Sequence, residues 1–296
     1  MKPAPFKYAA PRSLDEALSL KAQNSETSRF LAGGQSLVPT MNFRLAQPEI
    51  LIDLNCLDGQ DYVREAAGGA LRVGALTRHR AMQFDPLIVE RQPLVNEAAF
   101  QVAHQQIRNR GTLCGNLAHA DPASEMPAVM LALGARLHAR SVDTDRWIEA
   151  GAFFRGVFET ALDDKEMLIE VELPALPPRT GTCFLEVARR AGDYAMMGVA
   201  VLVSLDGDGA CAEVRLACCS AAETPVLATK AARTLIGARI DDATAREAGS
   251  LVRDELDPPG NVHCSSGYKR QLAGVLTRRA LETAARRAIA APASSS

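Results

Sequence analysis

The chain has 296 residues, which is long enough for two domains, and its net charge of −2 argues against a nucleic-acid partner. No run of about eighteen apolar residues is present, so we expect no membrane span. The N-terminus carries early prolines and acidic residues where a signal peptide would need an apolar core. We therefore expect a cytoplasmic protein.

The seven cysteines form an odd set and show no C-x-x-C spacing. Zinc sites and thiolate-held iron–sulfur clusters usually require close pairs or a tight run of ligands. The adjacent pair Cys218 and Cys219 lies in an apolar segment and reads as small strand residues. We expect structural thiols, and no metal or cluster held by this chain.

The N-terminal half alternates predicted helices and strands. Ser13, followed three residues later by a glutamate, forms a capping box and predicts a helix. The segment S-R-F-L-A-G-G-Q-S-L at 28–37 reads as a short strand that runs into a glycine pair. Residues 49–55 and 70–76 are apolar and predict two further strands. Thr77 is a suitable N-cap for the helix expected next.

Farther along, residues 94–107 have apolar positions at helical spacing, and a glycine-bearing turn precedes a helix that begins near Ser124. A strand is expected over about 163–173. The proline-rich segment L-P-P-R-T-G at 176–181 is the best candidate for a domain boundary. Beyond it, strands separated by an Asp-Gly turn at 206–209 give way to alanine-rich helices. The pattern predicts an α+β fold.

Two segments combine small residues with hydroxyl and amide side chains: A-G-G-Q-S at 32–36 and T-L-C-G-N at 112–116. Successive backbone N–H groups of small residues hold phosphates well. Neither segment matches the dinucleotide fingerprint G-x-G-x-x-G or a P-loop. On these residues alone, a phosphate site and a pair of ordinary turns are equally supported.

Six motifs resemble the medium, FAD-binding subunit of the molybdenum hydroxylases, the family of xanthine dehydrogenase, carbon monoxide dehydrogenase and bacterial nicotine, quinoline and caffeine dehydrogenases. They occur in the family's order and span nearly the whole chain. They include F-x-Y-x-x-P-x-S-L-x-E-A, A-G-G-Q-S-L-x-P and Q-I-R-N-x-G-T-L, and they lie at residues 6–17, 32–39, 106–125, 165–174, 189–195 and 268–280.

The resemblance implies a two-lobed FAD-binding domain of the vanillyl-alcohol-oxidase (PCMH) type at residues 1–176, with lobes at about 1–57 and 58–176. A smaller α+β domain of the CO dehydrogenase flavoprotein type follows at 177–288. Residues 289–296 are expected to form a disordered tail. The fold class is therefore α+β with two domains.

The resemblance also implies a function. The chain would bind FAD noncovalently and pass electrons from a partner's [2Fe–2S] clusters to an external acceptor. The partners would be a large molybdopterin-binding subunit and a small [2Fe–2S] subunit, assembled as a dimer of heterotrimers. The residues of the motifs resemble most those of subunits that act on N-heterocycles. The external acceptor would be NAD, a quinone, a carrier protein or oxygen.

Carried over position by position, the resemblance implies FAD-binding residues but no catalytic or metal-binding residue in this chain. The first segment would surround the pyrophosphate and the second would contact phosphate and ribityl groups. The implied residues are Ala32, Gly33, Gly34, Gln35, Ser36, Leu37, Thr112, Cys114, Gly115, Asn116, His119, Ser124, Glu125, Met167, Leu168 and Tyr194.

Two positions depart from the family pattern. Cys114 replaces the first glycine of a Gly-Gly pair, so its thiol is expected to lie near the flavin phosphates or ribityl chain and crowd them. On that view, Cys114→Gly would keep or tighten FAD binding. Glu186 stands where relatives often carry lysine, which removes an expected cation near the flavin.

Two alternatives stay open: a self-sufficient FAD oxidase or dehydrogenase with its own substrate pocket, and a structural subunit that has lost its cofactor. Among other polar residues, His79 is expected to be a surface or capping histidine and His104 a packing residue. Arg108 and Arg110 flank the second segment, where contact with a pyrophosphate and simple solvation are equally supported.

Overall fold

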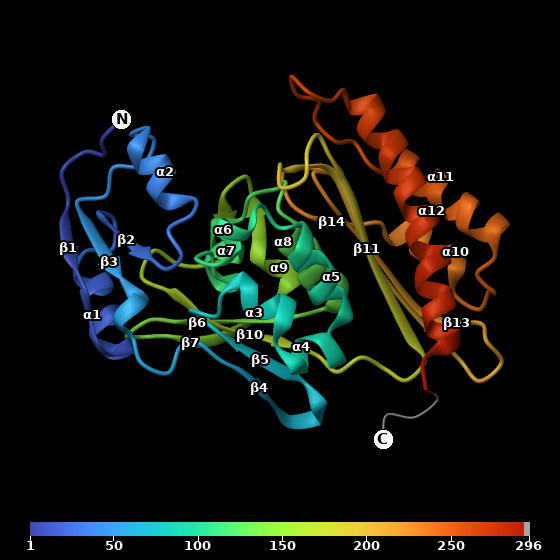
Figure 1. The fold of residues 1–296 in the computed structure, drawn as a ribbon, viewed down its shortest axis with the longest axis horizontal. Coiled ribbons are helices and arrows are strands. Elements are labelled where there is room, and N and C mark those ends of the chain that lie inside the picture. Colours follow the sequence, from blue (N-terminus) through green and yellow to red (C-terminus); the bar gives the residue numbers. More distant parts are fainter. Residues whose placement is uncertain (293–296) are drawn as a thin grey trace.

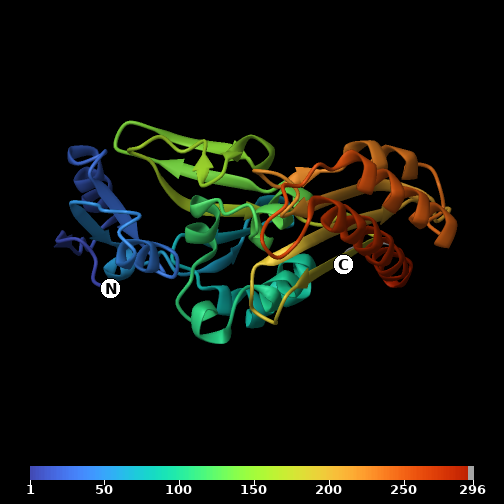
Figure 2. The same cartoon turned by 90° about the horizontal axis from the view of Figure 1, so that it is seen from above.

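The computed structural model describes residues 1–292, which form three parts arranged along the long axis of the molecule (Figures 1 and 2). The N-terminal part is a three-stranded parallel sheet of order β1-β3-β2 with two helices. Its elements are β1 (Lys7–Ala9), α1 (Leu14–Gln23), β2 (Ser28–Leu31), α2 (Leu37–Asn42), β3 (Ile50–Asp53) and the 3₁₀ turn η1 (Leu54–Cys56).

The predicted N-cap of α1 is confirmed, because the Ser13 hydroxyl accepts a hydrogen bond from the N–H of Glu16. The reciprocal bond of the capping box differs from the prediction. The Glu16 carboxylate accepts from the N–H of Arg12 instead of the N–H of Ser13.

The middle part is an antiparallel sheet of order β4-β5-β10-β6-β7, with helices packed on one face (Figure 1). Its strands are β4 (Val63–Glu65), β5 (Leu71–Gly74), β6 (Arg136–Arg140), β7 (Asp145–Glu149) and β10 (Met167–Leu173). The 3₁₀ turn η2 (Ala67–Gly69) joins β4 to β5, and a hairpin of β8 (Phe154–Gly156) and β9 (Glu159–Thr160) precedes β10. The helices are α3 (His79–Phe84), α4 (Pro86–Arg91), α5 (Pro93–Gln101), α6 (Gln105–Arg108), α7 (Leu113–His119), α8 (Glu125–Leu133) and α9 (Ala150–Phe153).

The C-terminal part is an antiparallel sheet of order β11-β12-β13-β14. Helices of this part cover one face, and α5 and α8 of the middle part pack against the other (Figure 1). Its elements are β11 (Thr180–Ala188), β12 (Ala195–Leu205), β13 (Cys211–Cys219), β14 (Val226–Leu227), α10 (Thr229–Leu235), α11 (Asp242–Glu255) and α12 (Ser266–Ala290).

Strand β12 explains why this sheet is buried on both faces. Its side chains alternate between two apolar cores, as strand geometry requires. Ala200 and Leu202 belong to the core shared with the middle part, whereas Val199, Val201 and Val203 pack under the C-terminal helices. The sheet is thereby fixed against the middle part, together with the loop that joins β11 to β12.

The helix predicted over 94–107 is interrupted, which corrects the sequence interpretation. Ala103 adopts a left-handed backbone (φ 43°), so α5 ends before it and α6 begins after it. The guanidinium of Arg108 stabilises the break by donating to the carbonyls of Val102 and Ala103, at 2.9 and 2.6 Å. Arg108 therefore has a structural role at this bend.

Thr77 is not the N-cap of the next helix, because α3 begins one residue later with Arg78 at the cap position. The Thr77 hydroxyl instead exchanges hydrogen bonds with the backbone N–H and carbonyl of Tyr62, at 3.0 and 2.9 Å. It joins the start of the helix to the edge of the sheet.

The predicted disordered tail is wrong for residues 289 and 290, which are helical in the last turn of α12. The rest of that prediction, residues 293–296, lies outside the described residues. Within residues 1–292, no helix has both the length and the apolar character needed to cross a membrane.

Candidate functional site

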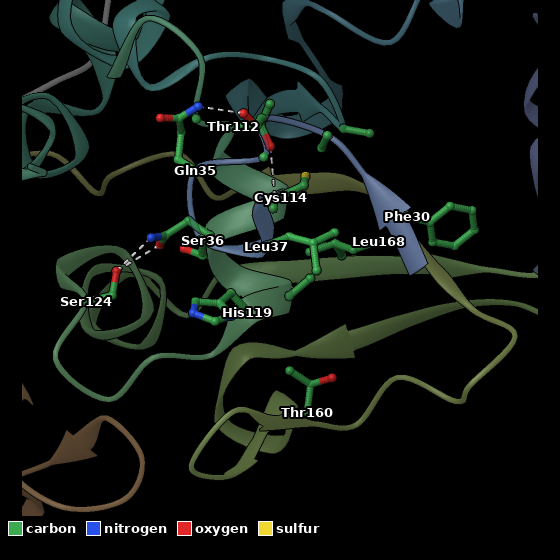
Figure 3. Close-up of a pocket in the computed structure, with 18 of the residues that line it drawn as sticks. Phe30, Gln35, Ser36, Leu37, Thr112, Cys114, His119, Ser124, Thr160 and Leu168 are labelled. Atoms are coloured by element: carbon green, nitrogen blue, oxygen red, sulfur yellow. Dashed lines mark hydrogen bonds between the residues drawn. The ribbon is translucent and has the colours of Figure 1, made fainter. Parts of the chain in front are cut away.

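A cavity of about 740 Å³ opens where the three parts meet. Figure 3 labels ten of the residues that line it. This volume lies within the range of about 300–1,000 Å³ typical of cofactor and ligand pockets. All sixteen residues that the sequence singles out line this one cavity. They come from the β2–α2 loop, α7, the start of α8, the start of β10 and the β11–β12 loop.

The β2–α2 loop brings backbone N–H groups to the cavity. In the part of the chain that the structure describes, the N–H groups of residues 33–37 donate no hydrogen bond to protein. Gly34 has a positive φ of 71°, which a side chain would strain. At Gly33, a Cβ would lie 2.6 Å from the Cα of Gly111 and would also meet the carbonyl of Arg110. The first glycine-bearing segment therefore touches the backbone just before the second, and Gly33 allows that approach.

The second segment is the N-terminus of α7, not the turn that the sequence suggests. The Thr112 hydroxyl caps the helix by accepting from the N–H of Gly115, at 3.0 Å. A Cβ at Gly115 would lie 2.6 Å from that hydroxyl. Asn116 and Ser124 exchange side-chain hydrogen bonds at 2.8 and 3.0 Å, which join α7 to the start of α8.

Cys114 lines the cavity, but its thiol lies in a different environment from the one predicted. The residue is 3% exposed and belongs to the core of the middle part. The Sγ atom lies 3.8 Å from the carbonyl oxygen of Gly74, and burial raises the pKa of the thiol. The side chain thus packs between α7 and β5, and replacing it with glycine would remove core contacts rather than relieve crowding.

Two acidic side chains meet beside the cavity, at the interface of the middle and C-terminal parts. Glu125 is 4% exposed at the first position of α8, and burial raises its pKa to about 7. Glu186 projects from β11, where burial and then the charge of Glu125 raise its pKa to about 8. Its Oε2 atom is buried and has no hydrogen-bond partner among the described residues. Opposite it on β12, the absence of a side chain at Gly198 leaves room for the thiol of Cys219.

The C-terminal part contributes to the cavity through the β11–β12 loop. Tyr194 on this loop is 64% exposed and lines the cavity with Asp193 and Gly192. Gly192 has a φ of 85°, and a Cβ there would collide with the imidazole of His104. His104 is thus a packing residue, as predicted, and it supports this loop.

The sequence interpretation was wrong about His79, which is 3% exposed and lines the cavity. Burial, followed by the charge of Arg108, lowers its pKa to about 4, so the imidazole is neutral at pH 7. Its position at the start of the helix that follows an apolar strand is the signal in the sequence that could have suggested burial.

Other cavity residues were missed as well. Phe30 in β2 and Phe158 at the tip of the β8–β9 hairpin both line the cavity. Phe158 has a left-handed φ of 57° and stacks near His119, with ring centroids 4.9 Å apart. Phe30 could have been found from its place in the strand that leads into the glycine pair, three residues before Gly33. Phe158 carries no comparable signal, because its position depends on a hairpin distant in sequence.

Comparison with known families assigns both halves of the chain. Residues 4–176 match the FAD binding domain in molybdopterin dehydrogenase. Residues 182–284 match the CO dehydrogenase flavoprotein C-terminal domain. The expected two-domain α+β architecture is thereby confirmed.

Similar proteins cover the chain almost end to end. The 6-hydroxypseudooxynicotine dehydrogenase complex subunit alpha of Paenarthrobacter nicotinovorans is 37% identical over 97% of each chain. Caffeine dehydrogenase subunit beta of a Pseudomonas species is 38% identical over 98% of each chain. The structure of quinoline 2-oxidoreductase from Pseudomonas putida superposes with a TM-score of 0.92 at 38% identity, covering 98% of this chain and 100% of that one.

The carbon monoxide dehydrogenase structure from Hydrogenophaga pseudoflava superposes with a TM-score of 0.93 at 34% identity, covering 97% of this chain and 99% of that one. The family model on residues 4–176, the full-length relatives and these superpositions agree with the six motifs in the sequence. The chain therefore belongs to the FAD-binding medium subunits of the molybdenum hydroxylases, which carry electrons through FAD within a multi-subunit oxidoreductase.

Proposed function

We propose that the sixteen cavity residues named above bind FAD noncovalently in this chain. The observation that supports this most directly is the row of N–H groups at residues 33–37, which face no protein acceptor. Such a row of donors suits the oxygens of a diphosphate. Gly33 and Gly34 line the cavity without a side chain that would cover these donors, and Met167 and Leu168 supply an apolar wall. The residues present thus fit the cofactor.

When bound, FAD supplies the redox chemistry, and the protein supplies binding, orientation and the electrostatic environment. The β2–α2 loop and the N-terminus of α7 would hold the diphosphate. Tyr194 and Phe158, both exposed at the cavity, would bound the space that an external electron acceptor must reach. Because electron transfer needs no general acid or base, the proposal assigns no catalytic residue to this chain.

We further propose that the complex hydroxylates an N-heterocycle or a related small molecule. The supporting relatives carry the names of nicotine, caffeine and quinoline enzymes, all N-heterocyclic compounds. We propose a dimer of heterotrimers with a molybdopterin subunit and a [2Fe–2S] subunit, and domain limits at 1–176 and 177–288. The seven cysteines are all free, which favours the reducing cytoplasm.

The proposal is tested by absorbance spectra of the chain purified alone and with its partner subunits. We expect flavin bands near ~450 nm, and substrate turnover only in the complex. Turnover of substrate by the isolated yellow chain would instead support a self-sufficient oxidase. A colourless chain in a complex that still turns over substrate would support a structural subunit without cofactor.

A further inference from the structure

The two glycine-bearing segments are joined behind the cavity by a chain of polar side chains. Asn55, in the turn after β3, donates from Nδ2 to the carbonyl of Ala32 at 2.9 Å. Arg78, before α3, donates to Oδ1 of Asn55 at 2.5 Å and also to the carbonyl of Arg110. One side-chain pair therefore holds the carbonyl of Ala32 in the first segment and that of Arg110, two residues before the second segment.

This arrangement orients the backbone N–H groups. The C=O and N–H of a trans peptide point in opposite directions, so fixing the Ala32 carbonyl on one side turns the N–H of Gly33 to the other. Gly33 lines the cavity, whereas Asn55 and Arg78 lie outside its lining. The pair thus holds the carbonyl on the outer side, and the N–H of Gly33 faces the space where the diphosphate would lie.

The linked pair is itself anchored in the sheet of the N-terminal part. The carboxylate of Asp53, at the end of β3, accepts from the backbone N–H of Asn55 at 2.9 Å and from the hydroxyl of Tyr8 at 2.5 Å. Arg78 is half-buried, and burial followed by the charge of Arg110 lowers its pKa. The two arginines repel each other, and an anion in the cavity would offset that repulsion.

We propose that Asn55 and Arg78 are positioning residues that act as one unit, setting the spacing of the two segments and hence the affinity for the FAD diphosphate. This inference rests on the proposed FAD site. It assigns a role to two residues outside the cavity, neither of which the six sequence motifs contain.

The test is a titration of FAD into the deflavinated complex, for the wild type, Asn55→Ala, Arg78→Ala, Arg78→Lys and the double alanine variant. We expect each alanine variant to weaken FAD binding about fivefold to tenfold, the effect of losing one or two hydrogen bonds. Arg78→Lys should behave like Arg78→Ala, because an ammonium group cannot reproduce the fork that reaches two acceptors.

The double variant separates positioning from independent structural damage. If the pair acts as one unit, the double variant should bind FAD no more weakly than the weaker single variant. Losses that add, or single variants with wild-type affinity, would overturn the inference. Full rescue by Arg78→Lys would also overturn it, because charge alone would then suffice.

Matched controls are Arg91→Ala, which removes a half-exposed arginine paired with Glu65, and Asn24→Ala, which removes an amide bonded to Leu20. Both should keep wild-type affinity, and thermal denaturation confirms that each variant is folded. A wild-type complex that binds no FAD would overturn the proposed function and this inference with it. Wild-type binding with unaffected variants would overturn the inference alone.

Discussion

Buried carboxylates occur in two regions of this molecule, and their surroundings differ. On the face of the five-stranded sheet turned away from the helices, Glu170 lies 3.2 Å from Arg64 and 3.7 Å from Arg72. Burial would raise the pKa of Glu170, but the His138 ring and the two arginines bring it below its usual range. Glu125, beside the cavity, is equally buried yet has a pKa raised to about 7.

Burial alone therefore does not decide whether these carboxyl groups are charged. The sheet face supplies cations, whereas the groups that face Glu125 and Glu186 are acidic or neutral: Asp121, Tyr194 and the thiol of Cys219. The nearby ammonium of Lys269 donates to the carbonyl of Ser220 instead. The raised pKa values of Glu125 and Glu186 lessen the negative charge beside a site that is proposed to hold a diphosphate.

The largest expected effect comes from removing the cation that pairs with a third buried carboxylate, Glu166, which lies just before β10 and lines the cavity. Arg146 holds the buried carboxylate of Glu166 through two contacts of 2.7 Å. We expect Arg146→Ala to lower the free energy of unfolding by about 2–3 kcal/mol, because it leaves a buried charge without its cation. The value stays below that of a fully buried pair because the arginine is 44% exposed.

Denaturant unfolding at neutral pH measures this loss. Arg91→Ala is the control, since its partner Glu65 is exposed and such surface pairs contribute at most about 1 kcal/mol. An Arg146→Ala variant as stable as the control variant would show that Arg146 does not stabilise the buried charge of Glu166.

A smaller effect is expected from Glu186→Gln at the domain interface. Between the ordinary value of 4.5 and about 8, folded Glu186 keeps a proton that the unfolded chain releases. The folded state therefore binds more protons, and the free energy of unfolding falls as pH rises through this window. The variant should flatten that fall and be more stable than wild type by about 1–2 kcal/mol at about pH 9, after a discount for solvent screening.

Urea denaturation of both proteins at several pH values between about 5 and 9 checks this prediction. Equal slopes of stability against pH in the variant and the wild type would mean that Glu186 is not a protonated buried acid.

The smallest effect is spectroscopic and concerns His138 on the sheet face. The ring of His138 stacks on the ring of Trp147, with the two ring centroids 4.4 Å apart. Trp147 is the single tryptophan of the chain. The carboxylates of Glu170 and Asp145 raise the pKa of His138 above 6.5. Tryptophan fluorescence should therefore titrate with a midpoint above 6.5, and Glu170→Gln should lower that midpoint. An unchanged midpoint in the variant would show that Glu170 does not stabilise the charged ring.

Much of the fold and the lining of the site could be predicted because the relevant signals are local. Apolar alternation located β2, β3 and β5, and the glycine-bearing segments marked the places where backbone approaches the cavity. The roles of Asn55 and Arg78 could not be predicted, because their hydrogen bonds join segments 23 and 32 residues apart in sequence. The burial of His79 and the turn of Cys114 toward Gly74 likewise depend on tertiary packing.

The helix break at Ala103 could not be predicted from the sequence for a related reason. Helical periodicity continues through residues 94–107, yet Arg108 compensates the lost helical hydrogen bonds by binding the carbonyls at the bend. A local pattern cannot show a compensation supplied by a side chain that folds back on it.

The central claim is that this chain carries the FAD through which electrons leave the complex. The most direct measurement removes FAD from the purified complex, adds substrate, and follows both reduction of the partner's iron–sulfur clusters and reduction of an external acceptor. We predict that the clusters are still reduced, that the acceptor is not, and that added FAD restores acceptor reduction. Undiminished acceptor reduction without FAD would contradict the claim.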